Sequence, residues 1–164
     1  MEANDLHLRR VVTPAMALET VLVAVDRPDE GQIESLVSTV TDLAGPAAAD
    51  VLLLHAFTRE SYDESVDRLD FEDASDADVD TVASRLNGVR GVAGGLDDGG
   101  LEVEIKGAIG EAGETIVGYA EKEGADLVVV GGRNRSPTGK AVFGSTAQEV
   151  MLNAHCPVTF VRTG

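Results

Sequence analysis

Two hydrophobic patterns alternate along this chain. Short apolar runs, typical of buried strands, are separated by longer segments in which apolar residues recur every three or four positions, as on one face of a helix. Such alternation predicts a domain of the α/β class. We expect five strands, at Thr20 to Asp26, Asp50 to Phe57, Leu101 to Lys106, Asp126 to Gly131 and Pro157 to Arg162.

About four helices are expected between these strands, on both faces of the sheet. Apolar stripes predict the first three, and they run from Ile33 to Leu43, from Val79 to Ala93 and from Ile116 to Ala120. Gly124 suits the left-handed residue that ends the third helix. The fourth helix is expected from Ser145 to Asn153, with Ser145 and Gln148 spaced as a capping box.

The burial expected of each strand predicts the strand order. The first and fourth strands are almost entirely apolar, as central strands covered on both faces are, whereas the third alternates apolar and charged residues and belongs at an edge. Right-handed crossovers then give a single doubly wound, Rossmann-like domain with a five-stranded parallel sheet of order 3-2-1-4-5. Because the winding reverses between strands 1 and 4, we expect a ligand crevice where Asp26 meets Gly131.

The net charge of −16 on 164 residues narrows the choice of partners. The average field of such a protein repels nucleic acid and anionic membranes, so neither is expected as a partner. The acids are scattered over the predicted helices and loops without the spacing of a calcium loop, and three of the 13 cations are lysines. We interpret the acids as a solvated coat suited to high intracellular salt. A calcium-binding surface is the alternative, but no metal site is predicted.

Length and hydropathy indicate one domain at residues 19 to 164. The hydrophobic pattern predicts no helix or strand in residues 1 to 18, and we interpret them as a disordered N-terminal extension. No apolar run approaches the roughly 18 residues of a membrane span, and we expect a cytoplasmic protein. The single cysteine, Cys156, has no partner for an intramolecular disulfide, and we expect it to be a small buried hydrophobe near a strand.

The C-terminal quarter is poor in acids. After Asp126 the only carboxylate side chain is Glu149, although composition alone would place roughly seven there. A loop in this stretch holds Arg133, Arg135 and Lys140. It leaves the fourth strand at Gly131-Gly132 and ends at Gly144-Ser145-Thr146, where the last helix begins. A strand, a glycine-rich loop and a helix N-terminus together form the layout of a phosphate-binding loop.

Two common nucleotide motifs do not fit this loop. The pair Gly139-Lys140 is followed by Ala141 where a Walker A motif has the Ser or Thr that holds magnesium. A Rossmann dinucleotide site needs a glycine-rich turn after the first strand, and this strand ends in Asp26-Arg27-Pro28-Asp29.

The loop does resemble the nucleotide loop of the universal stress protein family, whose pattern is Gly, two residues, Gly, nine residues, Gly, then Ser or Thr. Here Gly131-Gly132-Arg133-Asn134 is followed by nine residues and then by Gly144-Ser145. Asn134 stands where the family has its second glycine, and asparagine is the non-glycine residue best able to adopt positive φ. The resemblance covers about residues 19 to 163, including a first strand that ends in Asp26.

This resemblance implies an adenine-nucleotide site that takes ATP, with or without Mg²⁺. The Asp26 carboxylate would accept hydrogen bonds from ribose hydroxyls or from an adenine edge. Asp26 is also a candidate N-cap for the following helix. Arg133, Arg135 and Lys140 would supply countercharge. The implied binding residues are Ala24, Val25, Asp26, Ala56, Val130, Gly131, Arg133, Asn134, Gly144, Ser145 and Thr146.

The resemblance also implies a stress-response or signalling module that forms a homodimer by antiparallel pairing of the fifth strand, Val158 to Arg162. No catalytic residue is predicted, because the sequence shows no nucleophile elbow, no paired metal-binding histidines and no acid beside the loop to orient a water. We interpret His55 as a hydrogen-bonded core histidine. Two alternatives stay open: a nucleotide-independent regulatory or scaffold dimer, and a slow ATPase.

Overall fold

A computed structural model describes residues 17–72, 77–133 and 143–163 of the chain, and its centre is a five-stranded parallel sheet. The strand order is β3-β2-β1-β4-β5, so the predicted fold class and strand order are confirmed. The third, fourth and fifth strands continue beyond their predicted ends, the third also starts two residues later, and the first stops two residues earlier. The strands are β1 (Thr20–Ala24), β2 (Asp50–Phe57), β3 (Val103–Ile109), β4 (Leu127–Arg133) and β5 (Val158–Thr163).

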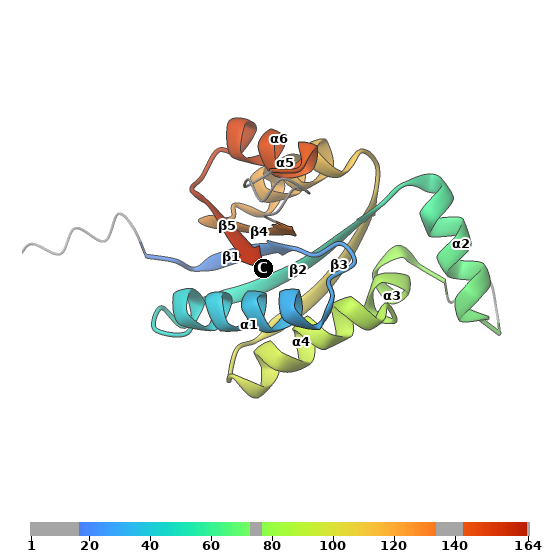
Figure 1. Cartoon of the computed structure of the whole chain (residues 1–164), viewed down its shortest axis with the longest axis horizontal. Helices are drawn as coiled ribbons and strands as arrows, with labels where there is room; N and C mark the ends of the chain where they lie inside the picture. Colours follow the sequence, from blue (N-terminus) through green and yellow to red (C-terminus); the bar gives the residue numbers. More distant parts are fainter. Residues whose placement is uncertain (1–16, 73–76, 134–142, 164) are drawn as a thin grey trace, which may run out of the picture.

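Helices cover both faces of this sheet. Figure 1 shows α1 (Glu30–Ala44) and α4 (Asn87–Asp98) on one side, and α5 (Ala112–Glu123) and α6 (Ser145–Asn153) on the other. Alternate residues of the central strands serve the two layers: Val21 and Val23 of β1 pack toward α1 and α4, whereas Leu22 packs toward α5 and α6. Burial on both faces explains why β1 and β4 are nearly continuous apolar runs.

The connection between β2 and β3 differs from the prediction. Helix α2 (Arg59–Leu69) is an acidic helix that is not among those expected from the apolar stripes, and it projects from the body of the molecule (Figure 1). The single helix expected from Val79 to Ala93 is two, α3 (Val79–Ser84) and α4, because Leu86 adopts the extended backbone of an N-cap. The described residues therefore form six helices rather than about four.

Among the helix ends, one prediction is confirmed and two differ from the structure. Gly124 ends α5 in the left-handed conformation, as expected. The capping box predicted at Ser145 is wrong, because Gly144 is the N-cap of α6 and the side-chain amide of Gln148 instead donates to the Phe143 carbonyl at 2.9 Å. Asp26 does not cap α1 either; Asp29 does, through a reciprocal capping box with Gln32.

The structure also bears on the predictions for Cys156 and for membrane-spanning segments. Cys156 is half-buried rather than buried, beside the core under α5 and α6, and burial raises the pKa of its thiol. No helix in the described part of the chain is long and apolar enough to cross a membrane.

Candidate functional site

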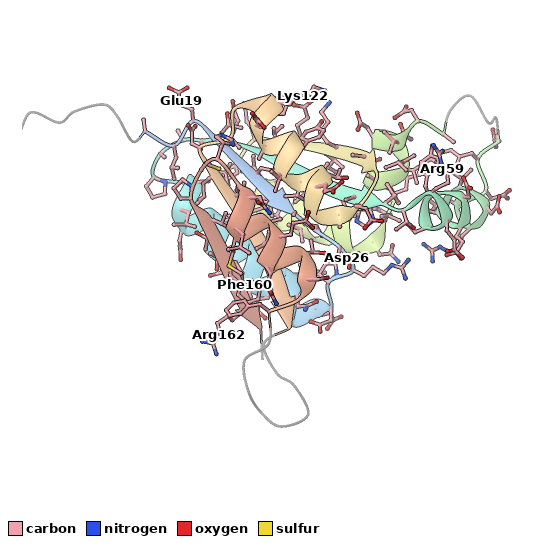
Figure 2. All side chains as sticks on the ribbon, turned by 90° about the horizontal axis from the view of Figure 1, so that it is seen from above. Glu19, Asp26, Arg59, Lys122, Phe160 and Arg162 are labelled. Carbon is pink, nitrogen blue, oxygen red and sulfur yellow. The ribbon has the colours of Figure 1, made fainter. Side chains whose placement is uncertain are left out.

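The carboxyl ends of β1 and β4 open into the larger of two cavities at this point of the sheet. Strand β1 ends at Ala24, which pairs in register with Val130 of β4, and from there the chain turns toward α1 on one face. The chain that leaves β4 reaches α6 on the other face. A cavity of about 870 Å³ lies between them, under α5 and α6. Figure 2 shows Asp26 at this end of β1 and Glu19 at the opposite end.

Most residues expected at the site line this one cavity. They come from the ends of β1, β2 and β4 and from the start of α6, which are far apart in the sequence: Ala24, Val25, Asp26, Ala56, Val130, Gly131, Gly144, Ser145 and Thr146. Arg133 is the last residue of β4, and its side chain lies outside the described residues, as do Asn134, Arg135 and Lys140. The structure thus brings nine of the eleven predicted residues together.

His55 holds the end of β1 in place. The Val25 amide donates to the Leu54 carbonyl at 2.9 Å, and the Val25 carbonyl accepts a hydrogen bond of 2.8 Å from Nδ1 of His55. The imidazole is 5% exposed and packs edge-on against Phe57. Burial lowers the pKa of His55, and the nearby Arg27 lowers it further, while the Val25 and Asp26 carbonyls and the Asp26 carboxylate oppose the shift. The neutral imidazole with its proton on Nδ1 is therefore the favoured form.

Two consecutive glycines, Gly131 and Gly132, leave the end of β4 without a side chain on either face of the sheet. A Cβ on Gly131 would point toward α1 and lie 3.4 Å from Leu36, whereas a Cβ on Gly132 would point toward the ring of Phe160 at 3.1 Å. The second contact is tighter than van der Waals packing normally allows. Both glycines line the cavity, and the missing side chain at Gly132 lets the Phe160 ring lie close to the strand.

Helix α6 presents its N-terminus to the cavity. Its N-cap is Gly144, which has no side chain, so the N-cap residue supplies no side-chain oxygen to the first amides of the helix. Ser145, Thr146 and Ala147 all line the cavity. The first amides and the helix dipole give this corner a partial positive charge, which suits an anion. Phe143 packs edge-on against Phe160 just before the helix starts.

Half of the residues that line the cavity are not among those predicted from the sequence. His55 was expected to serve only the core, and eight further lining residues were not anticipated: Arg27, Thr58, Ser61, Ala112, Ile116, Gly132, Ala147 and Phe160. Thr58 and Ser61 are the capping box of α2, which the sequence did not reveal as a helix. The apolar stripe of α5 did contain Ile116, but a stripe shows only that a residue faces inward, and its two ends look alike in sequence.

The charged groups at this site do not form a metal centre. Within residues 17–72, 77–133 and 143–163, no group of three or more His, Cys, Asp or Glu side chains is arranged to hold a metal ion. Among the described side chains that line the cavity, Asp26 and Arg27 carry the charges. What the geometry offers is backbone donors at α6, one carboxylate, one guanidinium and apolar walls.

Solved structures with the same fold include three nucleotide complexes. A universal stress protein in complex with cAMP superposes with a TM-score of 0.63 at 19% identity, covering 90% of this chain and 99% of that one. A universal stress protein of Archaeoglobus fulgidus in complex with dAMP gives 0.60 at 19% identity over 89% and 99% of the two chains. A family member of Arabidopsis thaliana with AMP bound gives 0.59 at 16% identity over 89% and 92%.

Sequence comparison leads to the same family. A universal stress protein of Mycolicibacterium smegmatis is 37% identical over 90 residues, which is 54% of this chain and 69% of that protein. The model of the universal stress protein family matches residues 17–162, nearly the whole described chain. The chain belongs to the universal stress protein family.

Proposed function

We propose that this stress protein is a cytoplasmic signalling module that binds an adenine nucleotide, including ATP, in the cavity between the ends of β1 and β4. The observation that carries the proposal is the convergence of four distant segments on one cavity, whose lining includes both the N-terminus of α6 and the carboxylate residue Asp26. The three related complexes contain AMP, dAMP and cAMP, which share an adenine and a single phosphate. That shared chemistry defines the ligand class.

The roles follow from the chemistry of each wall. Asp26 accepts hydrogen bonds from ribose hydroxyls, with the Ala24-Val25 backbone beside it, and Ala56 forms an apolar wall for the base. The amides of Ser145 and Thr146 donate to phosphate oxygens at the start of α6. In ATP the additional phosphates also lie at the start of α6, with Mg²⁺ as a counterion supplied with the nucleotide.

Calorimetric titration of the full chain tests this proposal. AMP, cAMP, ATP and Mg-ATP are titrated in turn, with GMP as the control for base selectivity. We expect micromolar dissociation constants for the adenine nucleotides and a melting temperature that rises with ligand concentration by mass action. The titrations are run at low and at high potassium chloride, because we also propose that the acidic coat is adapted to concentrated salt.

A pair of variants at Ser145 isolates the contribution of the helix amide. Gly144 has φ −63° and ψ 159°, a conformation that a following proline accepts, and proline is favoured at the first position of a helix. Ser145→Pro therefore removes one amide donor without unfolding α6, whereas Ser145→Ala removes only the hydroxyl. We expect Ser145→Pro to weaken AMP binding roughly tenfold more than Ser145→Ala does, as for one charge-assisted hydrogen bond.

The alternatives make different predictions in the same experiments. If no adenine nucleotide changes the heat signal or the melting temperature, the protein is a nucleotide-independent regulatory dimer. If phosphate release from ATP exceeds background and Asp26→Ala abolishes it, the protein is a slow ATPase. In the proposed module, occupancy of the cavity changes the surface around α6 and β5 without turnover.

We also propose that the protein is a homodimer paired through β5, Val158 to Arg162. Strand β5 is an edge strand of the sheet formed by the described residues, and its inner side pairs with β4. Two such edges can pair antiparallel and extend the sheet across both copies.

A further inference from the structure

A smaller cavity of about 320 Å³ lies on the α1 side of the sheet, directly opposite the main one. The two cavities share the end of β1, the residue Arg27 and the glycine pair of β4. The smaller cavity, called the α1-side pocket below, is completed by Pro28, Gln32 and Leu36. Gly131 is central to it, because a side chain there would point toward Leu36 and occupy the space. The two cavities therefore meet at the switch point of the sheet.

Two side chains with hydrogen-bond donors, Arg27 and Gln32, line the α1-side pocket. Arg27 contributes a guanidinium, which can form two parallel bonds to one phosphate. The amide oxygen of Gln32 accepts from the Asp29 backbone at 3.0 Å, so this cap uses the acceptor end of the amide and not the Nε2 donors. Asp26 is the one carboxylate in the lining, and Leu36 and Pro28 are apolar. Such a lining favours an acceptor-rich anionic group held by Arg27.

Asp26 joins the two cavities, since it lines both. This inference rests on the function proposed above, in which the Asp26 carboxylate accepts hydrogen bonds from the ribose hydroxyls. The 2′ and 3′ oxygens are then the part of the nucleotide closest to the α1-side pocket, while the 5′-phosphate lies at α6. A substituent on either oxygen would pass between the end of β1 and the glycine pair into this pocket.

We propose that the α1-side pocket is a second anion subsite, and that the protein binds adenine nucleotides that carry an additional phosphate on the 2′ or 3′ oxygen of the ribose. Arg27 and the Nε2 donors of Gln32 bind that phosphate. The Asp26 carboxylate repels it, so Arg27 is required to make the subsite favourable.

Calorimetry with three ligands tests the subsite: AMP, adenosine 2′,5′-bisphosphate and adenosine 3′,5′-bisphosphate. We expect one bisphosphate to bind roughly tenfold more tightly than AMP, as for one added charge-assisted contact. The bisphosphate that gains identifies the ribose oxygen that faces the pocket. In Arg27→Gln this preference should disappear or reverse, because the carboxylate of Asp26 is then uncompensated.

Gln32→Glu provides a matched variant that preserves the fold. Glutamate at this position completes a capping box with Asp29, so α1 keeps its N-terminus, but the change places a second carboxylate in the α1-side pocket. Gln32 does not line the main cavity. We expect the melting temperature and the AMP affinity of this variant to stay close to those of the parent protein, while the affinity for the favoured bisphosphate falls roughly tenfold.

The outcomes separate this inference from the proposed function. If AMP binds but neither bisphosphate binds more tightly, or if Gln32→Glu weakens AMP and the bisphosphates equally, the second subsite is wrong and the nucleotide site stands. If none of the three ligands binds, both proposals fail. A bisphosphate preference that depends on Arg27 and is lost in Gln32→Glu supports the subsite.

Discussion

The imidazole of His55 is a titratable group that the fold holds in its neutral form. It donates to the Val25 carbonyl at 2.8 Å and is 5% exposed, and burial lowers its pKa from the ordinary value of 6.5. In the unfolded chain the ring takes up a proton as the pH falls through 6.5, while in the folded chain it stays neutral to lower pH. We predict that acidification below this value lowers the free energy of unfolding, by at most about 1.4 kcal/mol per pH unit from this group.

The asparagine variant separates this effect from the many carboxylates of the chain. In His55→Asn the side-chain amide can still donate to the Val25 carbonyl but cannot titrate. Urea unfolding of both proteins between pH 5 and about 8 should show a shallower pH dependence for the variant in the acidic half of the range. Equal slopes would mean that His55 titrates alike in the folded and unfolded chains.

At the scale of elements, α3 covers the outer edge of β3. Asp80 of α3 accepts from the Gly107 amide at 2.8 Å and forms an ion pair with Lys106 at 3.5 Å. Gly107 lets the helix approach closely, because a Cβ there would lie 2.3 Å from the Val79 carbonyl oxygen. Gly107→Ala must therefore push α3 away from the strand. We predict a loss of roughly 1–3 kcal/mol in the free energy of unfolding, measured by urea denaturation.

Gly118 provides the control for this substitution. It is exposed within α5, and a Cβ there would meet no other atom within 4 Å. Gly118→Ala should stabilise the protein by about 0.5–1 kcal/mol, because alanine is the better helix former. Opposite signs for the two glycines would confirm the close approach of α3, whereas a stabilising Gly107→Ala would contradict it.

The elements that sequence predicted well are those whose pattern is fixed by burial on a whole face. Strand β1 is buried on both sides, so its apolar run and its central place could be inferred together. The acidic helix α2 has one buried residue, Ser65, and packs mainly through half-buried side chains, so its sequence carries little helical signal. The division between α3 and α4 depends on the extended backbone of Leu86, which a continuous apolar stripe does not reveal.

The residues of the candidate site also fall into those that could be predicted from the sequence and those that could not. Residues next to a strand end or a glycine motif, such as Asp26 and Gly131, could be predicted because parallel strands bring their carboxyl ends together. Arg27 could not, because nothing in the sequence shows that the chain after β1 borders cavities on both faces of the sheet. Phe160 was expected on an edge strand, and the sequence does not show that its ring reaches the cavity.

For the whole molecule, the outer edge of β5 is where two copies meet in the proposed homodimer. The Val128 amide donates to the Pro157 carbonyl, so in the parallel ladder the amides of Val158, Phe160 and Arg162 point away from β4. Figure 2 shows Phe160 and Arg162 together, on the side of the molecule away from Arg59 at the start of α2. Leu152 of helix α6, which contacts β5, is 82% exposed.

A proline at Val158 tests the dimer at this edge. In antiparallel pairing centred on Phe160, Val158 lies opposite Arg162 of the second copy, and the Val158 amide donates across the interface. Val158→Pro removes that amide from both copies, whereas Val158→Ala shortens the side chain and keeps the amide. We predict from sedimentation equilibrium that the proline variant weakens the dimer by roughly tenfold or more relative to the alanine variant, since two hydrogen bonds are lost at about 1 kcal/mol each. Circular dichroism should show both variants folded, because the lost amide does not face β4. A parent protein that sediments as a monomer, or a proline variant that dimerises as well as the alanine one, would exclude pairing through β5.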